Sequence, residues 1–393
     1  PLRKGRPYMK QRLLTPGPSP VPEETLLELA KPVFYHRSAQ FRQLLGEVLE
    51  DLKYVYCTRN PIAVLTASGT GGMEAAVANC LAPGSKAIIA VAGKFGERWR
   101  SIAKTFGVEV VSVTVPYGQP VQPEQIEQAL KQHPDAVAVC ATLSETSTGV
   151  RHDIQAFGKI VSQTNALLLV DGISGLGVSE CRVDDWGIDV CVTGSQKALM
   201  LPPGLAFLSI SDKAWQRIDK NSPSRVFYFD LRKYRDNLKT NDTPYTPAHT
   251  LVKALRVSLK QLRAEGIENV WARHARMAAA CRAGVQALGL ELFATQPIDG
   301  LTVVKTPEGI DGVALVSKLE KQYGIRIAGG QDPLKGKIFR IGHMGYIDQF
   351  DVLAGLSALE MVLLEMGYSL EPGSGVAAAQ RVLAQQVRTP QMV

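Results

Sequence analysis

The sequence lacks the patterns that place a protein in a membrane or around a metal ion. No apolar run approaches the ~20 residues that a membrane-spanning helix needs. The chain of 393 residues has six cysteines, none of them in a C-x-x-C pair or at metal-site spacing. Most lie in apolar runs, where a reduced, buried thiol is expected. The sequence therefore predicts a cytoplasmic protein with no membrane partner and no bound metal.

Signs of nucleic-acid binding are also absent. Lysine and arginine number 44 against 37 aspartates and glutamates, which gives a formal net charge of +7. The basic residues are dispersed, and no helix-turn-helix, zinc finger or aromatic–basic platform accompanies them. The densest basic stretch, residues 1–12, is predicted to be a solvated arm. With 45% hydrophobic and 21% charged residues, the composition is typical of a soluble enzyme without a nucleic-acid partner.

What the sequence does contain is an alternation of strand and helix patterns. The predicted strands are Ala63–Ala67, Lys86–Val91, Val108–Val115, Ala136–Ala141, Ala166–Asp171, Val190–Thr193 and Leu205–Ser209. The predicted helices between most of them are Gly72–Leu81, Arg98–Phe106, Pro123–Gln132 and Asp153–Thr164. Such alternation predicts an α/β fold with a mainly parallel, doubly wound sheet, which binds ligands at the carboxyl ends of its strands.

The later part of the chain has a different pattern, with long helical stretches and few strands. A chain of this length normally forms two or more domains. We expect an N-terminal arm at 1–22, a large domain at 23–268, a smaller α/β domain at 269–371 and a C-terminal tail at 372–393. The tail reads as a short helix with a frayed end.

Two polar residues at predicted strand ends carry the strongest chemical signal. Asp171 ends one apolar run, and Lys197 follows another 26 residues later. An acid and a lysine so placed suit pyridoxal phosphate, because the amine forms a Schiff base with the cofactor aldehyde and the carboxylate keeps the pyridine nitrogen protonated. Taken singly, Lys197 is more simply explained as a surface lysine and Asp171 as a helix N-cap.

A glycine-rich turn, Ser68-Gly69-Thr70-Gly71-Gly72, supplies a third element. It lies between a strand pattern and a helix pattern, where backbone N–H groups and the helix dipole favour a phosphate. The spacing fits neither the dinucleotide nor the P-loop fingerprint. A tight turn without a ligand remains the alternative on these residues alone.

Several short segments together give the chain a family resemblance. They are TPGPSPVP at 15–22, SGTG at 68–71, ETSTGV at 145–150, VD at 170–171, GSQKAL at 194–199 with PPG at 202–204, YTPA at 245–248 and FRIG at 339–342. In their order and spacing the chain resembles the class V, fold-type I pyridoxal phosphate aminotransferases, above all the alanine–glyoxylate and serine–glyoxylate enzymes. The match covers nearly the whole chain.

The resemblance implies a reaction and an assembly. The expected reaction transfers the amino group of alanine or serine to glyoxylate by a ping-pong cycle, giving glycine and a 2-oxo acid. The expected assembly is a homodimer in which the N-terminal arm and Asn221–Thr250 complete the partner's site. The donor stays open, because alanine and serine differ by one hydroxyl.

The resemblance also implies roles for single residues. Lys197 would hold the cofactor and move the proton, and Asp171 would pair with the pyridine nitrogen. The phosphate contacts would come from Ser68, Gly69, Thr70, Gln196 and, from the second subunit, Thr246.

Further contacts to the cofactor ring are implied for three residues. Thr146 would hydrogen-bond the ring hydroxyl, while Phe95 and Ile173 would pack on opposite ring faces. Phe95 departs from the best-known eukaryotic alanine–glyoxylate relatives, which have tryptophan there, so a core phenylalanine is the alternative.

Arg340 is the candidate substrate residue, with Gly17 lining the same pocket. An arginine inside an apolar strand is costly unless it is paired. Its planar fork suits a bidentate grip on an α-carboxylate.

Three readings of function stay open. The first is the glyoxylate aminotransferase. The second is a relative on the same fold, either a ureidoglycine–glyoxylate aminotransferase or a cysteine desulfurase; the latter needs a mobile cysteine near the C-terminal domain, and the last cysteine here is Cys281. The third is a non-catalytic or redox subunit, because some similar cyanobacterial chains have carried a soluble-hydrogenase label. Paired cysteines for an iron–sulfur cluster are absent.

Overall fold

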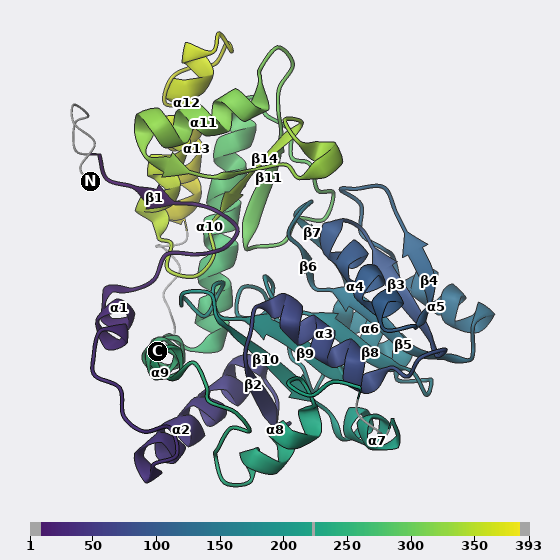
Figure 1. The fold of residues 1–393 in the computed structure, drawn as a ribbon. Coiled ribbons are helices and arrows are strands. Elements are labelled where there is room, and N and C mark those ends of the chain that lie inside the picture. Colours follow the sequence, from purple (N-terminus) through teal and green to yellow (C-terminus); the bar gives the residue numbers. More distant parts are fainter. Residues whose placement is uncertain (1–8, 222–224, 386–393) are drawn as a thin grey trace.

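The computed structural model describes residues 9–221 and 225–385, and its centre is a seven-stranded sheet (Figure 1). The strand order is β2 (Ile62–Thr66), β10 (Leu205–Ile210), β9 (Val190–Gly194), β8 (Leu167–Asp171), β5 (Ala136–Thr142), β3 (Lys86–Val91) and β4 (Glu109–Thr114). Only β10 is antiparallel to its neighbours; the other pairs are parallel. The predicted mainly parallel α/β sheet is confirmed.

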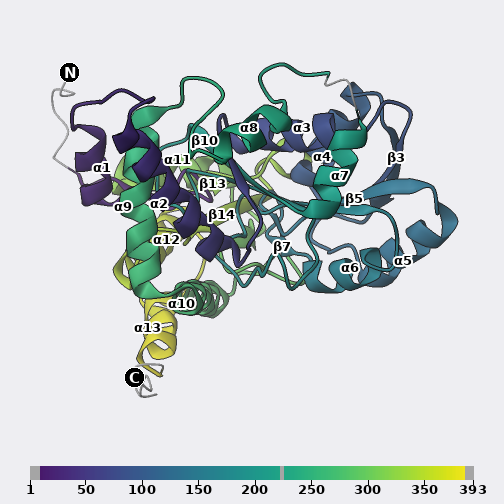
Figure 2. The same cartoon turned by 90° about the horizontal axis from the view of Figure 1, so that it is seen from below.

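Helices cover both faces of this sheet (Figure 2). One face carries α3 (Gly69–Cys80), α4 (Lys94–Thr105), α7 (Asp212–Lys220) and α8 (Leu231–Leu238). The other face carries α2 (Ala39–Tyr56), α5 (Pro123–Gln132), α6 (Ile154–Val161) and α9 (His249–Glu265). Because the strands are buried on both sides, they read in the sequence as near-continuous apolar runs.

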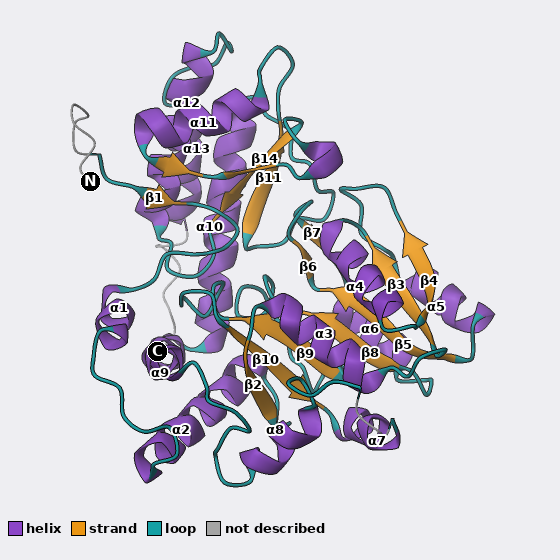
Figure 3. Cartoon of the chain, viewed as in Figure 1, coloured by secondary structure: helices purple, strands orange, loops and turns teal. Residues whose placement is uncertain are grey.

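A smaller antiparallel sheet lies apart from the large one (Figure 3). Its strands, in order, are β11 (Leu301–Lys305), β14 (Ile338–Gly342) and β13 (Ala328–Gly329). Around it lie α10 (Ile267–Ala287), α11 (Gly312–Tyr323), the short 3-10 turn η1 (Asp332–Leu334) and α12 (Gln349–Glu365). Helix α10 starts in the core of the large sheet, with Val270, and ends in that of the small sheet, with Val285. The domain boundary at 268 stays a prediction.

The N-terminal segment is part of the fold from residue 12 onward. Strand β1 (Arg12–Leu13) pairs in parallel with β12 (Ile325–Arg326), and Leu14 is buried in the small core. The chain then runs to the large sheet, where the Ser19 N–H donates to the Gln196 carbonyl at 3.0 Å, before α1 (Glu23–Leu29). The predicted solvated arm, residues 1–12, is therefore wrong at its last residue, Arg12, while residues 1–8 lie outside the described residues.

The C-terminal tail also packs, over α13 (Ser374–Gln385). Its first turn is held by the buried Glu360 carboxylate, which accepts the N–H groups of Gly375 at 2.9 Å and Val376 at 3.0 Å. Ala379 is fully buried in the small core. The prediction of a helix is confirmed and that of a frayed end is wrong for 374–385; residues 386–393 lie outside the described part.

Two helices begin earlier than predicted, and α1, α2, α7 and α8 were not predicted. Helix α3 starts at Gly69 rather than Gly72, and α4 starts at Lys94 rather than Arg98. Glycines at the start of α3 weaken the helical pattern, but a Cβ on Gly72 would lie 2.6 Å from Val192, so close packing on β9 requires glycine. Helix α8 interrupts the turn-rich segment 221–250. Within the described residues, no helix is long and apolar enough to cross a membrane.

Candidate active site

The predicted site residues gather at one edge of the large sheet. Parallel strands end at the same edge, so residues that follow different strands come together there. The phosphate turn follows β2, Phe95 follows β3, Asp171 ends β8 and Lys197 follows β9. Arg340 reaches the same place from β14 of the small sheet, where its Nη1 donates to the Thr146 carbonyl at 3.2 Å. Thr146 lies after the end of β5, between the short paired strands β6 (Ser144–Glu145) and β7 (Val150–Arg151).

Lys197 and Asp171 are both largely buried, and each alters the ionisation of the other. Removal from water lowers the pKa of Lys197 from 10.5 to about 8, an effect that Asp171 opposes and Arg340 reinforces. The amine donates a hydrogen bond to the Pro16 carbonyl. Burial raises the pKa of Asp171 from 3.8 to about 7, although its Oδ1 accepts the Ile173 N–H at 2.8 Å.

These pKa shifts affect how Lys197 and Asp171 can react with or bind a ligand. A lysine with a pKa near 8 is partly neutral at physiological pH, and the neutral amine is the nucleophile. No lysine or arginine nitrogen lies within 4 Å of the Asp171 carboxylate among the residues described. A protonated ring nitrogen facing this carboxylate would restore its ordinary ionisation.

The turn after β2 has the composition of a phosphate site. Ser68 is the N-cap of α3, but its side chain makes no capping hydrogen bond. Gly69 is needed because a Cβ there would lie 2.5 Å from Ile173 Cδ1. Gln196 Oε1 is buried without a hydrogen-bond partner among the described residues. A Cβ on Gly194 would lie 3.1 Å from this oxygen and 3.6 Å from the Gly69 nitrogen, so the Gln196 side chain lies near the start of α3. Helix N–H groups and a hydroxyl thus adjoin, as anion binding requires.

Phe95 is held by a buried acid that was not among the predicted site residues. Glu145 Oε2 accepts the N–H groups of Phe95 at 3.1 Å and Gly96 at 3.0 Å, at the start of α4. The Ser147 hydroxyl donates to Oε1 at 2.6 Å. Burial raises the pKa of Glu145 in spite of these donors. Its place in the ETSTGV segment, directly before Thr146, was the available signal.

Arg340 is a buried guanidinium without a carboxylate partner. It is 7% exposed, and its Nε and Nη2 donate to the Gly329 carbonyl at 3.0 and 2.8 Å. In the described part of the chain no acidic side chain lies within 4 Å of it. Burial lowers its pKa to about 10. Since a buried, unpaired charge is costly, this position favours an anionic ligand.

The remaining predicted residues are placed as follows. Gly17 has φ +105°, and a Cβ on it would lie 2.3 Å from Lys197 Nζ, so it lies against the amine. The Thr146 hydroxyl is hydrogen-bonded to the Ser174 hydroxyl. Thr246 is exposed, and no hydrogen bond joins it to the phosphate turn in the region that the structure describes.

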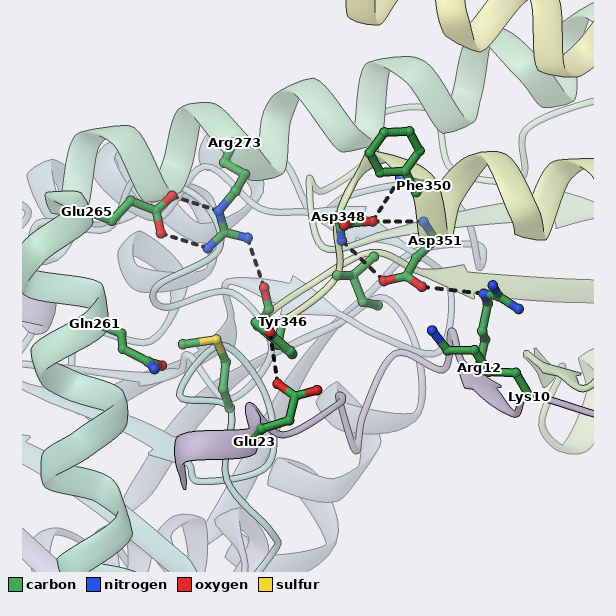
Figure 4. A pocket seen from close by; sticks show the side chains of 13 residues that line it. Lys10, Arg12, Glu23, Gln261, Glu265, Arg273, Tyr346, Asp348, Phe350 and Asp351 are labelled. Atoms are coloured by element: carbon green, nitrogen blue, oxygen red, sulfur yellow. Dashed lines mark hydrogen bonds and ion pairs between the residues drawn. The ribbon is translucent and has the colours of Figure 1, made fainter. Parts of the chain in front are cut away.

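A cavity elsewhere in the molecule does not belong to this site (Figure 4). Its volume is about 530 Å³, and it lies between α9, α10, the N-terminal segment and the start of α12. Facing side chains pair across it: Arg273 with Glu265 at 2.7 Å, and Tyr346 with Glu23 at 3.1 Å. Because most of its charges are already matched, the cavity offers no recognition group comparable with Arg340.

The residues at the sheet edge fit one cofactor. A phosphate suits the turn after β2, a protonated ring nitrogen suits Asp171, and an aldehyde suits the amine of Lys197. Pyridoxal phosphate combines these three groups.

Comparison with known proteins agrees with this fit. The family model described as "Aminotransferase class-V" matches residues 24–346. The chain is 42% identical to the soluble hydrogenase small subunit of a Synechococcus strain, over 95% of this chain and 99% of the relative. It is 39% identical to an L-aspartate–glyoxylate aminotransferase of Paracoccus denitrificans, over 94% and 95%. Other relatives at 35–37% identity are named serine–glyoxylate or alanine–glyoxylate aminotransferase.

Among solved structures, ureidoglycine–glyoxylate aminotransferase from Bacillus subtilis superposes with a TM-score of 0.92 at 32% identity, over 97% of this chain and all of that one. The fold is that of the fold-type I pyridoxal phosphate-dependent transferases. The chain belongs to the class V aminotransferase family. It is a pyridoxal phosphate-dependent aminotransferase, whose substrates are an amino acid and a 2-oxo acid.

The lowered pKa of Lys197 predicts a pH-dependent gain in stability for Lys197→Met in the cofactor-free protein. The folded protein disfavours the charged amine fully below pH 8, and this penalty fades as pH rises towards 10.5. The variant should be more stable at pH 7 by roughly 1–3 kcal/mol, and the gap should shrink between pH 8 and 10. Urea unfolding measures it, with the exposed Lys104→Met as the matched control. A gap that stays constant across this range contradicts the burial argument.

Proposed function

We propose that this aminotransferase transfers the amino group of alanine or serine to glyoxylate, giving glycine and pyruvate or hydroxypyruvate. The observation that carries the proposal is the buried guanidinium of Arg340, which has no carboxylate partner among the described residues and is close enough to Lys197 to lower the pKa of the amine. Alanine, serine and glyoxylate each present one carboxylate to such a group. The relatives named for glyoxylate as a substrate support the choice of acceptor.

Each polar side chain of the site has a task in this reaction. Pyridoxal phosphate, when bound, supplies an electron sink for the electrons released at the substrate Cα. The Asp171 carboxylate holds the proton on the ring nitrogen. The Lys197 amine moves a proton between the substrate Cα and the cofactor C4′, and its neutral form is favoured by burial.

Other residues bind and orient. The turn at Ser68, Gly69 and Thr70, together with Gln196, holds the phosphate. Phe95 and Ile173 would hold the ring between them, and the Thr146 hydroxyl would orient it. Arg340 grips the carboxylate of either substrate, with Gly17 leaving the space beside the amine open.

The alternative functions, which are other amino donors, a desulfurase and a redox subunit, differ in how well the observations support them. An aspartate or ureidoglycine donor is favoured by the names of the Paracoccus relative and the Bacillus structure. Desulfurase chemistry lacks support, because Cys281 is fully buried on α10. For a redox subunit, the described residues contain no cluster of three histidine, cysteine or acidic side chains that could hold a metal. A cytoplasmic location stays a prediction, consistent with six free cysteines.

A panel of amino donors tests the proposed substrates and the cycle. Alanine, serine, aspartate and ureidoglycine should be compared with glyoxylate as acceptor, and glyoxylate with pyruvate and hydroxypyruvate. Because both substrates use one guanidinium in turn, double-reciprocal plots at several fixed glyoxylate concentrations should be parallel. Intersecting lines contradict the ping-pong cycle. A preference for aspartate over alanine and serine would replace the proposed donor.

Arg340→Lys should impair both half-reactions. The variant keeps the positive charge but loses the planar fork. We expect kcat/KM for donor and acceptor to fall by an amount equivalent to roughly 2–4 kcal/mol, with little change in cofactor affinity. Stopped-flow absorbance with each substrate alone measures the two halves separately. Unchanged substrate affinities would mean that another residue grips the carboxylate.

We propose further that two subunits share each site. Exposed apolar side chains gather in two segments: Leu27, Val33 and Tyr35 are 65–68% exposed, and Phe227 is 75% exposed. Tyr228 and Tyr245 stack at 4.9 Å beside Phe227, which adds to an exposed aromatic surface. Clusters of this kind mark protein interfaces. In a two-fold dimer, the exposed Thr246 would reach the partner's phosphate turn.

Mixing two inactive variants tests the sharing. Lys197→Ala and Thr246→Ala homodimers should both be impaired, the first in chemistry and the second in cofactor binding. A hybrid with one subunit of each has one site with both residues intact, so mixed refolding should restore activity. Co-refolding the double variant with wild-type protein is the control. Sedimentation that shows a fully active species of 42.6 kDa would refute the dimer.

A further inference from the structure

Arg98 connects two parts of the site without having been assigned to it. It lies on α4, one helical turn after Phe95, and is partly buried. Its Nη1 donates to the Thr70 hydroxyl at 3.0 Å, and its guanidinium carbon lies 4.7 Å from the centroid of the Phe95 ring. The phosphate turn and the aromatic ring thus hold one guanidinium between them.

The charge of Arg98 is unpaired, unlike that of its neighbours on the same helix. Lys94 pairs with Glu97 at 2.6 Å, and Arg100 lies 3.8 Å from Glu97. Over residues 9–221 and 225–385, no carboxylate oxygen lies within 4 Å of the Arg98 guanidinium. The packing on Phe95 and the bond to Thr70 therefore fix a positive charge beside the phosphate turn.

A phosphate monoester needs such a charge. It carries about −1.5 to −2 at neutral pH, whereas the helix N-terminus offers only about +0.5. The other guanidinium of the site, Arg340, is held on the small sheet by the carbonyls of Gly329 and Thr146. Its fork faces the substrate in the proposed function.

We propose that Arg98 binds the phosphate group of the cofactor, as the cationic partner of Ser68, Gly69 and Thr70. The inference rests on the proposed assignment of that turn to the phosphate. The guanidinium donates hydrogen bonds to the phosphate oxygens. These bonds replace, or are added to, the one that Arg98 donates to the Thr70 hydroxyl. The Phe95 ring face holds the planar guanidinium in position.

The experiment compares two ligands on the cofactor-free protein: pyridoxal phosphate, and pyridoxal, which lacks the phosphate. Dissociation constants are measured by the quenching of tryptophan fluorescence for wild type, Arg98→Gln, Arg98→Lys and the control Arg100→Gln. Arg98→Gln should weaken pyridoxal phosphate on the order of 10–100-fold and leave pyridoxal unchanged. The affinity of Arg98→Lys for pyridoxal phosphate should lie between those of wild type and Arg98→Gln, because lysine keeps the positive charge but loses the planar fork of arginine. Arg100→Gln should bind both ligands as wild type does.

Inorganic phosphate gives an independent readout. It should compete with pyridoxal phosphate for the wild-type protein and compete far less for Arg98→Gln. Equal loss of both ligands in Arg98→Gln would assign Arg98 to ring packing alone and overturn the proposal, as would an unchanged affinity for pyridoxal phosphate.

Ser68→Ala separates this proposal from the one on which it rests. If Ser68→Ala leaves the ratio of the two ligand affinities unchanged while Arg98→Gln lowers it, the turn is misassigned and Arg98 still binds phosphate. If instead Ser68→Ala lowers the ratio and Arg98→Gln leaves it unchanged, the turn binds the phosphate and the proposed role of Arg98 is overturned. Circular dichroism checks that each variant folds. If Arg98→Gln does not fold, the comparison of the two ligands is made with Arg98→Lys instead.

Discussion

The site depends on keeping Asp171, Lys197 and Arg340 buried near one another without closing them into direct ion pairs. Each is held by backbone groups instead: Asp171 by the Ile173 N–H, Lys197 by the Pro16 carbonyl and Arg340 by the carbonyls of Gly329 and Thr146. A direct pair between Asp171 and Lys197 would restore ordinary ionisation and consume the groups that the chemistry requires. Backbone dipoles fix the side chains and leave their charges available to ligands.

The N-terminal segment joins the two sheets through the site itself. The Gly342 N–H, two residues after Arg340 on β14, donates to the Leu14 carbonyl at 2.7 Å. Five residues later, the Ser19 hydroxyl donates to the Lys197 carbonyl at 2.7 Å. The strand that carries Arg340 and the turn that carries Lys197 are thus joined by hydrogen bonds to one short segment of the chain. Residues 14–19, predicted from the sequence to belong to an N-terminal arm, therefore link the two sheets.

Much of the fold could be predicted because its signals are local. Buried parallel strands give apolar runs, and Asp171 and Lys197 stand where those runs stop. Other features arise only from tertiary contacts: the burial of Leu14 against the small sheet, the packing of α13, and the antiparallel direction of β10 have no local signature. Arg98 and Glu145 were missed for the same reason, since their partners Thr70 and Phe95 are 28 and 50 residues away in the chain. The role proposed for Thr246 has no local signature either, because it requires a second chain.

Helix α10 gives the molecule a mechanical property. Its 21 residues form a rod about 30 Å long, with one end fixed in the core beneath Lys197 and the other in the core behind Arg340. A tilt of about 5° at the first end would carry the far end through roughly 2–3 Å, as the length of the rod dictates. That travel is comparable to a hydrogen-bond length. The position of Arg340 relative to Lys197 therefore depends in part on how the apolar first turns of this helix pack in the core of the large sheet.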